Sequence, residues 1–209
     1  AIQKDFYLQL PTLYFVAALR EKKPGRVFAF FPRVDGISAW QRPLQDVHDS
    51  VQRVGKLGAI GVYASVGLSG ILRIRATRRN ARASENLLRA WTAHIQNAED
   101  VLSLDAGGAI VGDLVYDEWL KTGQHPTVEL DNPDFWEYLK NCSILCAWWI
   151  QYFDHHRVDA VVSSAVYLLA VPLRMATSRG IASYEVNVNA QGTRSFTVER
   201  PKPYLETAD

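Results

Sequence analysis

The sequence lacks the features that mark several large protein classes. It has two cysteines in 209 residues, and no apolar run approaches the roughly 18 residues that a membrane-spanning helix needs. Lys and Arg total 23 and Asp and Glu total 22, so the net charge of +1 creates no field that would draw the chain onto nucleic acid or acidic lipid. Hydrophobic residues make up 48% of the chain, which argues against disorder and leaves a soluble globular protein.

Several catalytic and targeting signatures are also missing. We find no Walker motif, no dinucleotide-binding glycine fingerprint and no Gly-x-Ser-x-Gly nucleophile elbow. A metal-binding Asp-x-Asp motif does not occur, and neither does a signal-peptide pattern, an internal repeat or a low-complexity tract. We therefore expect no metal ion and no cofactor.

The two cysteines, Cys142 and Cys146, lie four residues apart inside an apolar run. This spacing puts both on one face of a helix, and no further Cys or His nearby completes a zinc site. We expect buried, reduced thiols rather than a disulfide, which favours a cytoplasmic location.

Strands are predicted to alternate with helices along the chain. Apolar runs bounded by turn residues predict buried strands, and apolar residues spaced three or four apart predict helices. The predicted strands are residues 26–32, 58–64, 101–104, 159–164 and 181–187, and the predicted helices are 6–21, 42–54, 71–96, 113–121, 133–156 and 166–179.

This alternation predicts an α/β fold with a mostly parallel sheet flanked by helices, a three-layer Rossmann-like domain. We expect one domain over residues 1–200, with residues 201–209 as a tail or the start of an interdomain linker. Ligands bind such sheets at the carboxyl ends of the strands. The loops after Phe31, Ala64, Ser164 and Asn187 are therefore the places to look for a site.

Three other segments could bind ligands but have simpler explanations. The glycines of residues 67–70 could present N–H groups to a phosphate, although a plain turn is the simpler interpretation. An arginine cluster at 73–82 could hold a diphosphate or an acidic acceptor, but its members are spread around the helix, which favours a solvated surface. The Asp-His-His-Arg at 154–157 lacks metal-ligand spacing and is better explained as the polar end of a helix.

The densest candidate site is the segment Gly-Asp-Leu-Val-Tyr-Asp at residues 112–117. In a helix Asp113, Tyr116 and Asp117 share one face, because they occupy positions i, i+3 and i+4. The alternative is purely structural, with Asp113 as a capping residue, Asp117 exposed and Tyr116 packed.

This segment, followed by Trp-Leu-Lys at 119–121, resembles the "GDLIYDxxLR" signature of glycosyltransferases encoded in bacterial capsule and O-antigen loci. Three further segments resemble other parts of that family. They are the glycines of 105–111, the acidic stretch before an aromatic-rich helix at 131–153, and Asp-Ala-Val-Val-Ser-Ser-Ala-Val-Tyr at 159–167 with Arg174 and Gly180 after it. Two positions depart from it: Ala165 replaces a histidine, and Lys121 replaces an arginine and so lacks its bidentate fork.

The resemblance implies the acceptor-side N-terminal domain of a GT-B enzyme, which moves a sugar from a nucleotide donor to a surface polysaccharide or lipid-linked acceptor. Such enzymes have a second Rossmann-like domain, so this chain is expected to be part of a longer enzyme or to work with another polypeptide. The resemblance also implies that Asp113 is the catalytic residue, which acts as the general base or orients the acceptor hydroxyl. The implied substrate-binding residues are Gly112, Tyr116, Asp117, Lys121, Tyr167 and Arg174.

Two other functions stay open at the level of sequence. The chain could be a non-catalytic module that presents a glycan to a separate catalytic subunit, in keeping with Ala165 and with the length of only one domain. It could also be a small esterase with Ser163 or Ser164 as nucleophile, although neither lies in an elbow motif. Nucleic acid is not expected as a partner, and lipid-linked acceptors would place the protein at the periphery of the inner membrane.

Overall fold

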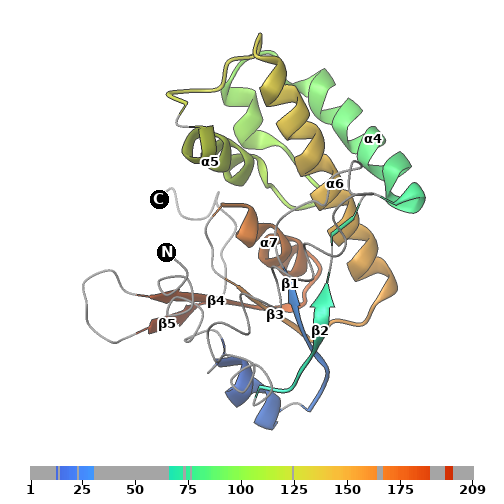
Figure 1. The fold of residues 1–209 in the computed structure, drawn as a ribbon, viewed down its shortest axis with the longest axis vertical. Coiled ribbons are helices and arrows are strands. Elements are labelled where there is room, and N and C mark those ends of the chain that lie inside the picture. The colour runs from blue at the N-terminus through green and yellow to red at the C-terminus, as the bar shows by residue number, and fades with distance from the viewer. Residues whose placement is uncertain are drawn as a thin grey trace, which may run out of the picture.

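The computed structural model describes residues 13, 15–22, 24–30, 66–72, 74, 75, 77–123, 125–163, 167–188 and 196–199. Within these residues the chain is a mixed α/β structure with two small sheets. Figure 1 shows α4 (Arg78–His94), α5 (Gly112–Gly123) and α6 (Pro133–His155) gathered at one end of the molecule and the strands at the other. α7 (Val171–Ser178) lies between them.

The first sheet pairs β1 (Val27–Phe30) in parallel with β2 (Leu68–Leu72). The strand predicted at 26–32 is thus confirmed in its described part, but the helix predicted to begin at residue 71 is wrong at its start, because it begins seven residues later. Residues 71 and 72 continue the ladder against β1, and the helix starts only at Arg78, after the Thr77 cap. The turn predicted near Gly67 is present, and Gly67 itself has a φ of 67°.

The second sheet orders its strands β3 (Ala160–Ser163), β4 (Ala182–Val188) and β5 (Phe196–Glu199). β3 and β4 are parallel and are joined through η3 (Tyr167–Ala170) and α7, as the alternation predicts. β5 was not predicted, and it runs antiparallel to β4. The α/β class is therefore confirmed, whereas a three-layer Rossmann-like arrangement is not seen in the two small sheets.

The helices predicted near the middle of the chain are confirmed, with Pro133 at the start of α6 and Asn132 as its N-cap. One strand prediction there is wrong, because residues 99–103 form the 3₁₀ helix η2 (Glu99–Ser103). Its start is fixed by Asn97, whose side-chain oxygen accepts from the backbone N–H groups of Glu99 and Asp100. These local bonds compete with a strand ladder.

The main hydrophobic core lies among the helices rather than between helices and a broad sheet. Fully buried side chains come from η2, α5, α6 and α7, among them Val101, Val115, Leu139 and Leu173. Phe30 of β1 packs edge-on against Trp149 of α6, which joins the first sheet to this core. Cys142 and Cys146 are free and buried there, as predicted.

The described residues do not cover every prediction. The helix at 42–54, the strand at 58–64 and the tail at 201–209 lie outside them. The helix at 6–21 is present in its described part, residues 13 and 15–22. Each helix in the described part of the chain is too short or too polar to cross a membrane.

Candidate functional site

The predicted site is organised by the N-terminus of α5, which begins at Gly112. A Cβ atom on Gly112 would collide with the backbone oxygen of Val101 and lie 2.6 Å from the backbone oxygen of Leu102. Only glycine lets the start of α5 pack this closely against η2. Gly112 therefore has a packing role, which places the residues that follow it.

Asp113 is buried and forms a bidentate ion pair with Arg174 of α7, 61 positions away in sequence. One guanidinium nitrogen donates to Oδ1 and the other to Oδ2, the latter at 2.6 Å. Arg174 also donates to the backbone oxygen of Ile110 at 3.0 Å, just before α5. The pair ties α7 to the start of α5, and both carboxylate oxygens of Asp113 are engaged.

Asp117 lies one helical turn after Asp113 and is exposed. Desolvation raises the pKa of Asp117, the negative charge of Asp113 raises it further, and the positive charge of Arg174 opposes them. These electrostatic effects place Asp117 close to the buried pair. It is the more accessible of the two carboxylates.

Lys121 continues the same face of α5, since Asp113, Asp117 and Lys121 are spaced four residues apart. Its Nζ lies 3.8 Å from the centroid of the Tyr167 ring, a cation–π contact between α5 and η3. The backbone of Tyr167 has a φ of 52°, a value that residues other than glycine rarely adopt. Tyr167 comes four positions after Ser163, the last residue of β3, so this contact follows the carboxyl end of a parallel strand.

Tyr116 faces a different neighbour. Its hydroxyl is 3.2 Å from Oγ1 of Thr127, and the ring packs against the core while the residue stays partly exposed. The structure thus joins the predicted residues in two direct contacts, Asp113 with Arg174 and Lys121 with Tyr167. Asp117 lies between these contacts along α5, and Tyr116 lies to one side.

The other segments singled out by sequence have structural roles. His155 and His156 at the end of α6 lie with Nδ1 at 2.8 Å and 3.0 Å from the backbone oxygens of Gln151 and Tyr152, in the last turn of the helix. This confirms the interpretation of 154–157 as a polar helix end. Ser163 is buried and donates to the backbone oxygen of Leu169 at 3.1 Å, so it is not a free nucleophile.

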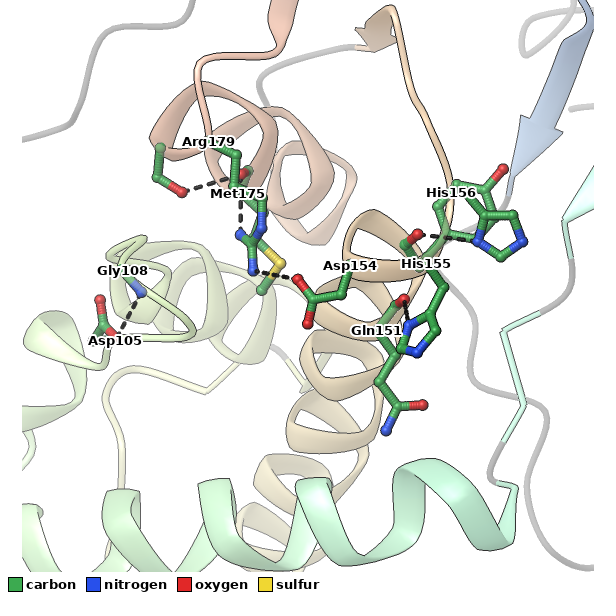
Figure 2. A network of polar contacts seen from close by, with 10 residues as sticks. Asp105, Gly108, Gln151, Asp154, His155, His156, Met175 and Arg179 are labelled. Carbon is green, nitrogen blue, oxygen red and sulfur yellow. Dashed lines mark hydrogen bonds and ion pairs between the residues drawn. The ribbon is translucent and has the colours of Figure 1, made fainter.

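Sequence reasoning missed the contacts that fix this end of α6. Figure 2 shows Asp154 pointing toward Arg179, the C-cap of α7, while Gln151, His155 and His156 lie on the other side of α6. Arg179 donates to the backbone oxygen of Met175 at 3.1 Å and lies 3.9 Å from Asp154. The spacing of Asp154 and Arg179 in sequence gave no signal of this pair.

A cavity of about 150 Å³ lies between α4 and α6, and none of the residues predicted for the site lines it. Its walls include Arg79 from the predicted arginine cluster and His155. Among the described residues, no three His, Cys, Asp or Glu side chains are grouped so that they could hold a metal ion.

Comparisons with protein-family models, with curated proteins and with solved structures found no match for this chain.

Proposed function

We propose that this chain is a glycosyltransferase domain that holds the acceptor on the face formed by α5 and η3. The proposal joins the sequence resemblance to one observation. Asp113 and Arg174, both singled out by that resemblance and far apart in sequence, form a buried bidentate ion pair. Next to this pair lie an exposed carboxylate, Asp117, and the cation of Lys121.

In this proposal Asp113 has an orienting role. Asp113 is buried and both of its oxygens accept from Arg174, so a substrate hydroxyl would reach it only after the ion pair rearranges. Its negative charge raises the pKa of Asp117, and desolvation acts in the same direction. A carboxylate whose pKa moves toward neutral is a better general base. Asp117 is therefore the group that takes the proton from the acceptor hydroxyl as the new glycosidic bond forms.

Lys121 and Tyr167 would bind the acceptor beside Asp117. The ring of Tyr167 offers an apolar face and a hydroxyl, a combination suited to a sugar, and Lys121 adds a cation. The nucleotide-sugar donor would come from a second GT-B domain, in the same or another polypeptide. Proton transfer by a well-placed carboxylate contributes about 10²- to 10⁴-fold to such a reaction.

The test is sugar transfer by the complete protein, with its partner polypeptide where there is one. The substrates are a panel of labelled nucleotide sugars and a lipid-linked glycan extract. We expect Asp117→Asn to lower kcat about 100-fold or more, with a smaller effect on the KM for acceptor. The matched control is Glu129→Gln, which removes an exposed carboxylate on the loop before α6 and should leave transfer unchanged. Wild-type turnover by a folded Asp117→Asn protein would contradict the assignment of the base.

A glycan-binding module without catalysis is the second candidate, and the engaged carboxylate of Asp113 favours it, together with Ala165 at the position of the family's histidine. Calorimetric titration separates the two. A module binds the acceptor glycan with no transfer of any nucleotide sugar, even when neighbouring gene products are added. A transferase turns over at least one donor in the same mixture.

A further inference from the structure

The cavity between α4 and α6 lies apart from the proposed acceptor face, and its walls are cationic. Arg79 and Asn80 come from the first turn of α4, Thr77 is its N-cap, and Gln151 and His155 come from the end of α6. No aspartate or glutamate lines it. A cavity with a guanidinium and an imidazole but no carboxylate favours an anion.

Arg79 and His155 are held in place by bonds within and between the two helices. The side-chain amide of Gln151 donates to the backbone oxygen of Arg79 at 3.0 Å. Nδ1 of His155 lies 2.8 Å from the backbone oxygen of Gln151 and so donates to it, which leaves Nε2 as the ring atom that contacts the guanidinium of Arg79. Arg79 and His155 therefore contact each other at the cavity, and the imidazole of His155 is held there by its hydrogen bond to the backbone of α6.

A stack of rings forms the remaining wall. The rings of Trp148 and Tyr152 are nearly parallel, with centroids 5.0 Å apart, and those of Tyr152 and His156 are 4.4 Å apart. All three line the cavity, at four-residue spacing along α6. Because Trp148 and His156 cover the two faces of Tyr152, a bound ring would contact the edges of these rings, and edge-to-face contacts between rings are favourable without a specific hydrogen bond.

We propose that this cavity binds a small phosphomonoester, with the phosphate at Arg79 and the attached ring against the edges of the Trp148–Tyr152–His156 stack. The guanidinium fork suits bidentate contact with phosphate oxygens, and Nε2 of His155, which accepts from the guanidinium, holds Arg79 at the cavity. The cavity volume of about 150 Å³ is smaller than that of pockets that enclose a whole cofactor. The phosphate group of the ligand would therefore enter the cavity, and the remainder of the ligand would stay at its opening. The proposal does not depend on sugar transfer, because none of the residues of the acceptor face takes part.

Calorimetric titration of the full chain with inorganic phosphate and with phenyl phosphate tests this directly. We expect saturable binding of both and about tenfold tighter binding of phenyl phosphate, because only the latter contacts the ring stack. Absence of saturable phosphate binding at millimolar concentration would overturn the site, and equal affinities for the two probes would overturn the role of the rings.

Three variants assign the contacts. Arg79→Gln should weaken both probes about tenfold or more, since it removes a charge-assisted hydrogen bond. Arg89→Gln, an exposed arginine of the same helix that does not line the cavity, should leave both unchanged. Tyr152→Leu should weaken phenyl phosphate alone.

Each variant is checked for native circular dichroism before titration. Equal weakening by Arg79→Gln and Arg89→Gln would mean that only the general positive charge of α4 attracts phosphate, and would overturn the site. If Arg79→Gln does not fold, His155→Gln takes its place, and unchanged phosphate affinity in a folded His155→Gln protein counts against the proposal.

Discussion

At the scale of single residues, Gly112 sets the geometry of the candidate site. It has no room for a side chain, because the backbone oxygens of Val101 and Leu102 occupy the space where a Cβ atom would lie. The start of α5 would have to move away from η2 to accept any other residue. Such a shift would also displace Asp113 from Arg174.

We predict that Gly112→Ala lowers the free energy of unfolding by about 2–4 kcal/mol, measured by urea denaturation, since overpacking against backbone cannot be relieved by a rotamer change. The control is Gly25→Ala, because a Cβ atom on Gly25 meets nothing within 4 Å. It should change stability by less than about 0.5 kcal/mol. Equal effects of the two substitutions would mean that η2 and α5 are not packed as described.

The raised pKa of Asp117 gives a second prediction at this scale. A carboxyl group whose pKa is higher in the folded than in the unfolded protein binds its proton more tightly when folded. Its stabilising contribution is therefore present at pH values below the unfolded pKa and is lost as the pH rises through the folded pKa. The charged form of Asp117 is disfavoured in the folded protein.

Asp117→Asn should therefore be slightly more stable than wild type near neutral pH, by less than about 1 kcal/mol because Asp117 is exposed. Thermal melting across a pH series measures the difference, which should shrink as the pH falls below the unfolded pKa of aspartate. A variant less stable than wild type at neutral pH would show that Asp117 makes a favourable contact in its charged form.

At the scale of elements, α4 begins with a capping box. The Thr77 side chain accepts from the backbone N–H of Asn80, and the Asn80 side chain accepts from the backbone N–H of Thr77 at 2.6 Å. Asn80 is buried and also donates to the backbone oxygen of Arg75. This local network explains why α4 starts after Thr77, although the residues just before Thr77 have the same mixture of apolar and basic side chains as the residues predicted to be helical.

Thr77→Ala should destabilise the protein by about 1 kcal/mol in chemical denaturation, the usual loss for a helix cap. Thr92→Ala is the matched control within the same helix, because Thr92 bonds only to the carbonyl of its own helix and alanine is the better helix former there. Comparable losses from both substitutions would argue that the cap contributes nothing.

The central element, α6, holds both cysteines on its buried face. Burial raises the pKa of the Cys142 thiol to about 12 and that of Cys146 well above its ordinary value. Because the thiolate is the reactive form, both thiols should resist a disulfide reagent at pH 8 in the native protein. Both should react rapidly after denaturation, as counted by the absorbance of the released thiolate. Fast labelling of the native protein would place at least one thiol at the surface.

At the scale of the whole molecule, one continuous core joins the described helices. Leu139 of α6 and Leu173 of α7 are fully buried members of the same cluster, which also includes residues of η2 and α5. Elements that share a core in this way should unfold together. Figure 1 shows α7 between the helical end and the strands, where it connects the two.

Leu139→Ala and Leu173→Ala should each lower stability by about 2–5 kcal/mol. For each variant, tryptophan fluorescence and far-ultraviolet circular dichroism should report one coincident transition. Separate transitions in the Leu173→Ala protein would mean that the strand region folds independently of the helices. Leu102→Ala provides the surface control, since Leu102 is 39% exposed and should have little effect.

Elements whose signals are local could be predicted from the amino-acid sequence alone. Periodic apolar residues and the Asn132–Pro133 start defined α6, and Gly180 marked the end of α7. Short buried strands were predicted at β1, β3 and β4 because apolar runs between turn residues depend little on distant partners. The common face of Asp113, Asp117 and Lys121 also follows from helical spacing alone.

Tertiary structure decided what depends on distant partners. Residues 68–72 became a strand only because β1 lies beside them, and residues 99–103 became a 3₁₀ helix under side-chain bonds that periodicity does not encode. The engagement of Asp113 by Arg174, and the meeting of Arg79 with His155, required helices distant in sequence to pack together. Spacing can place a side chain on a face, but only packing decides which groups it meets there, because those groups come from other parts of the chain.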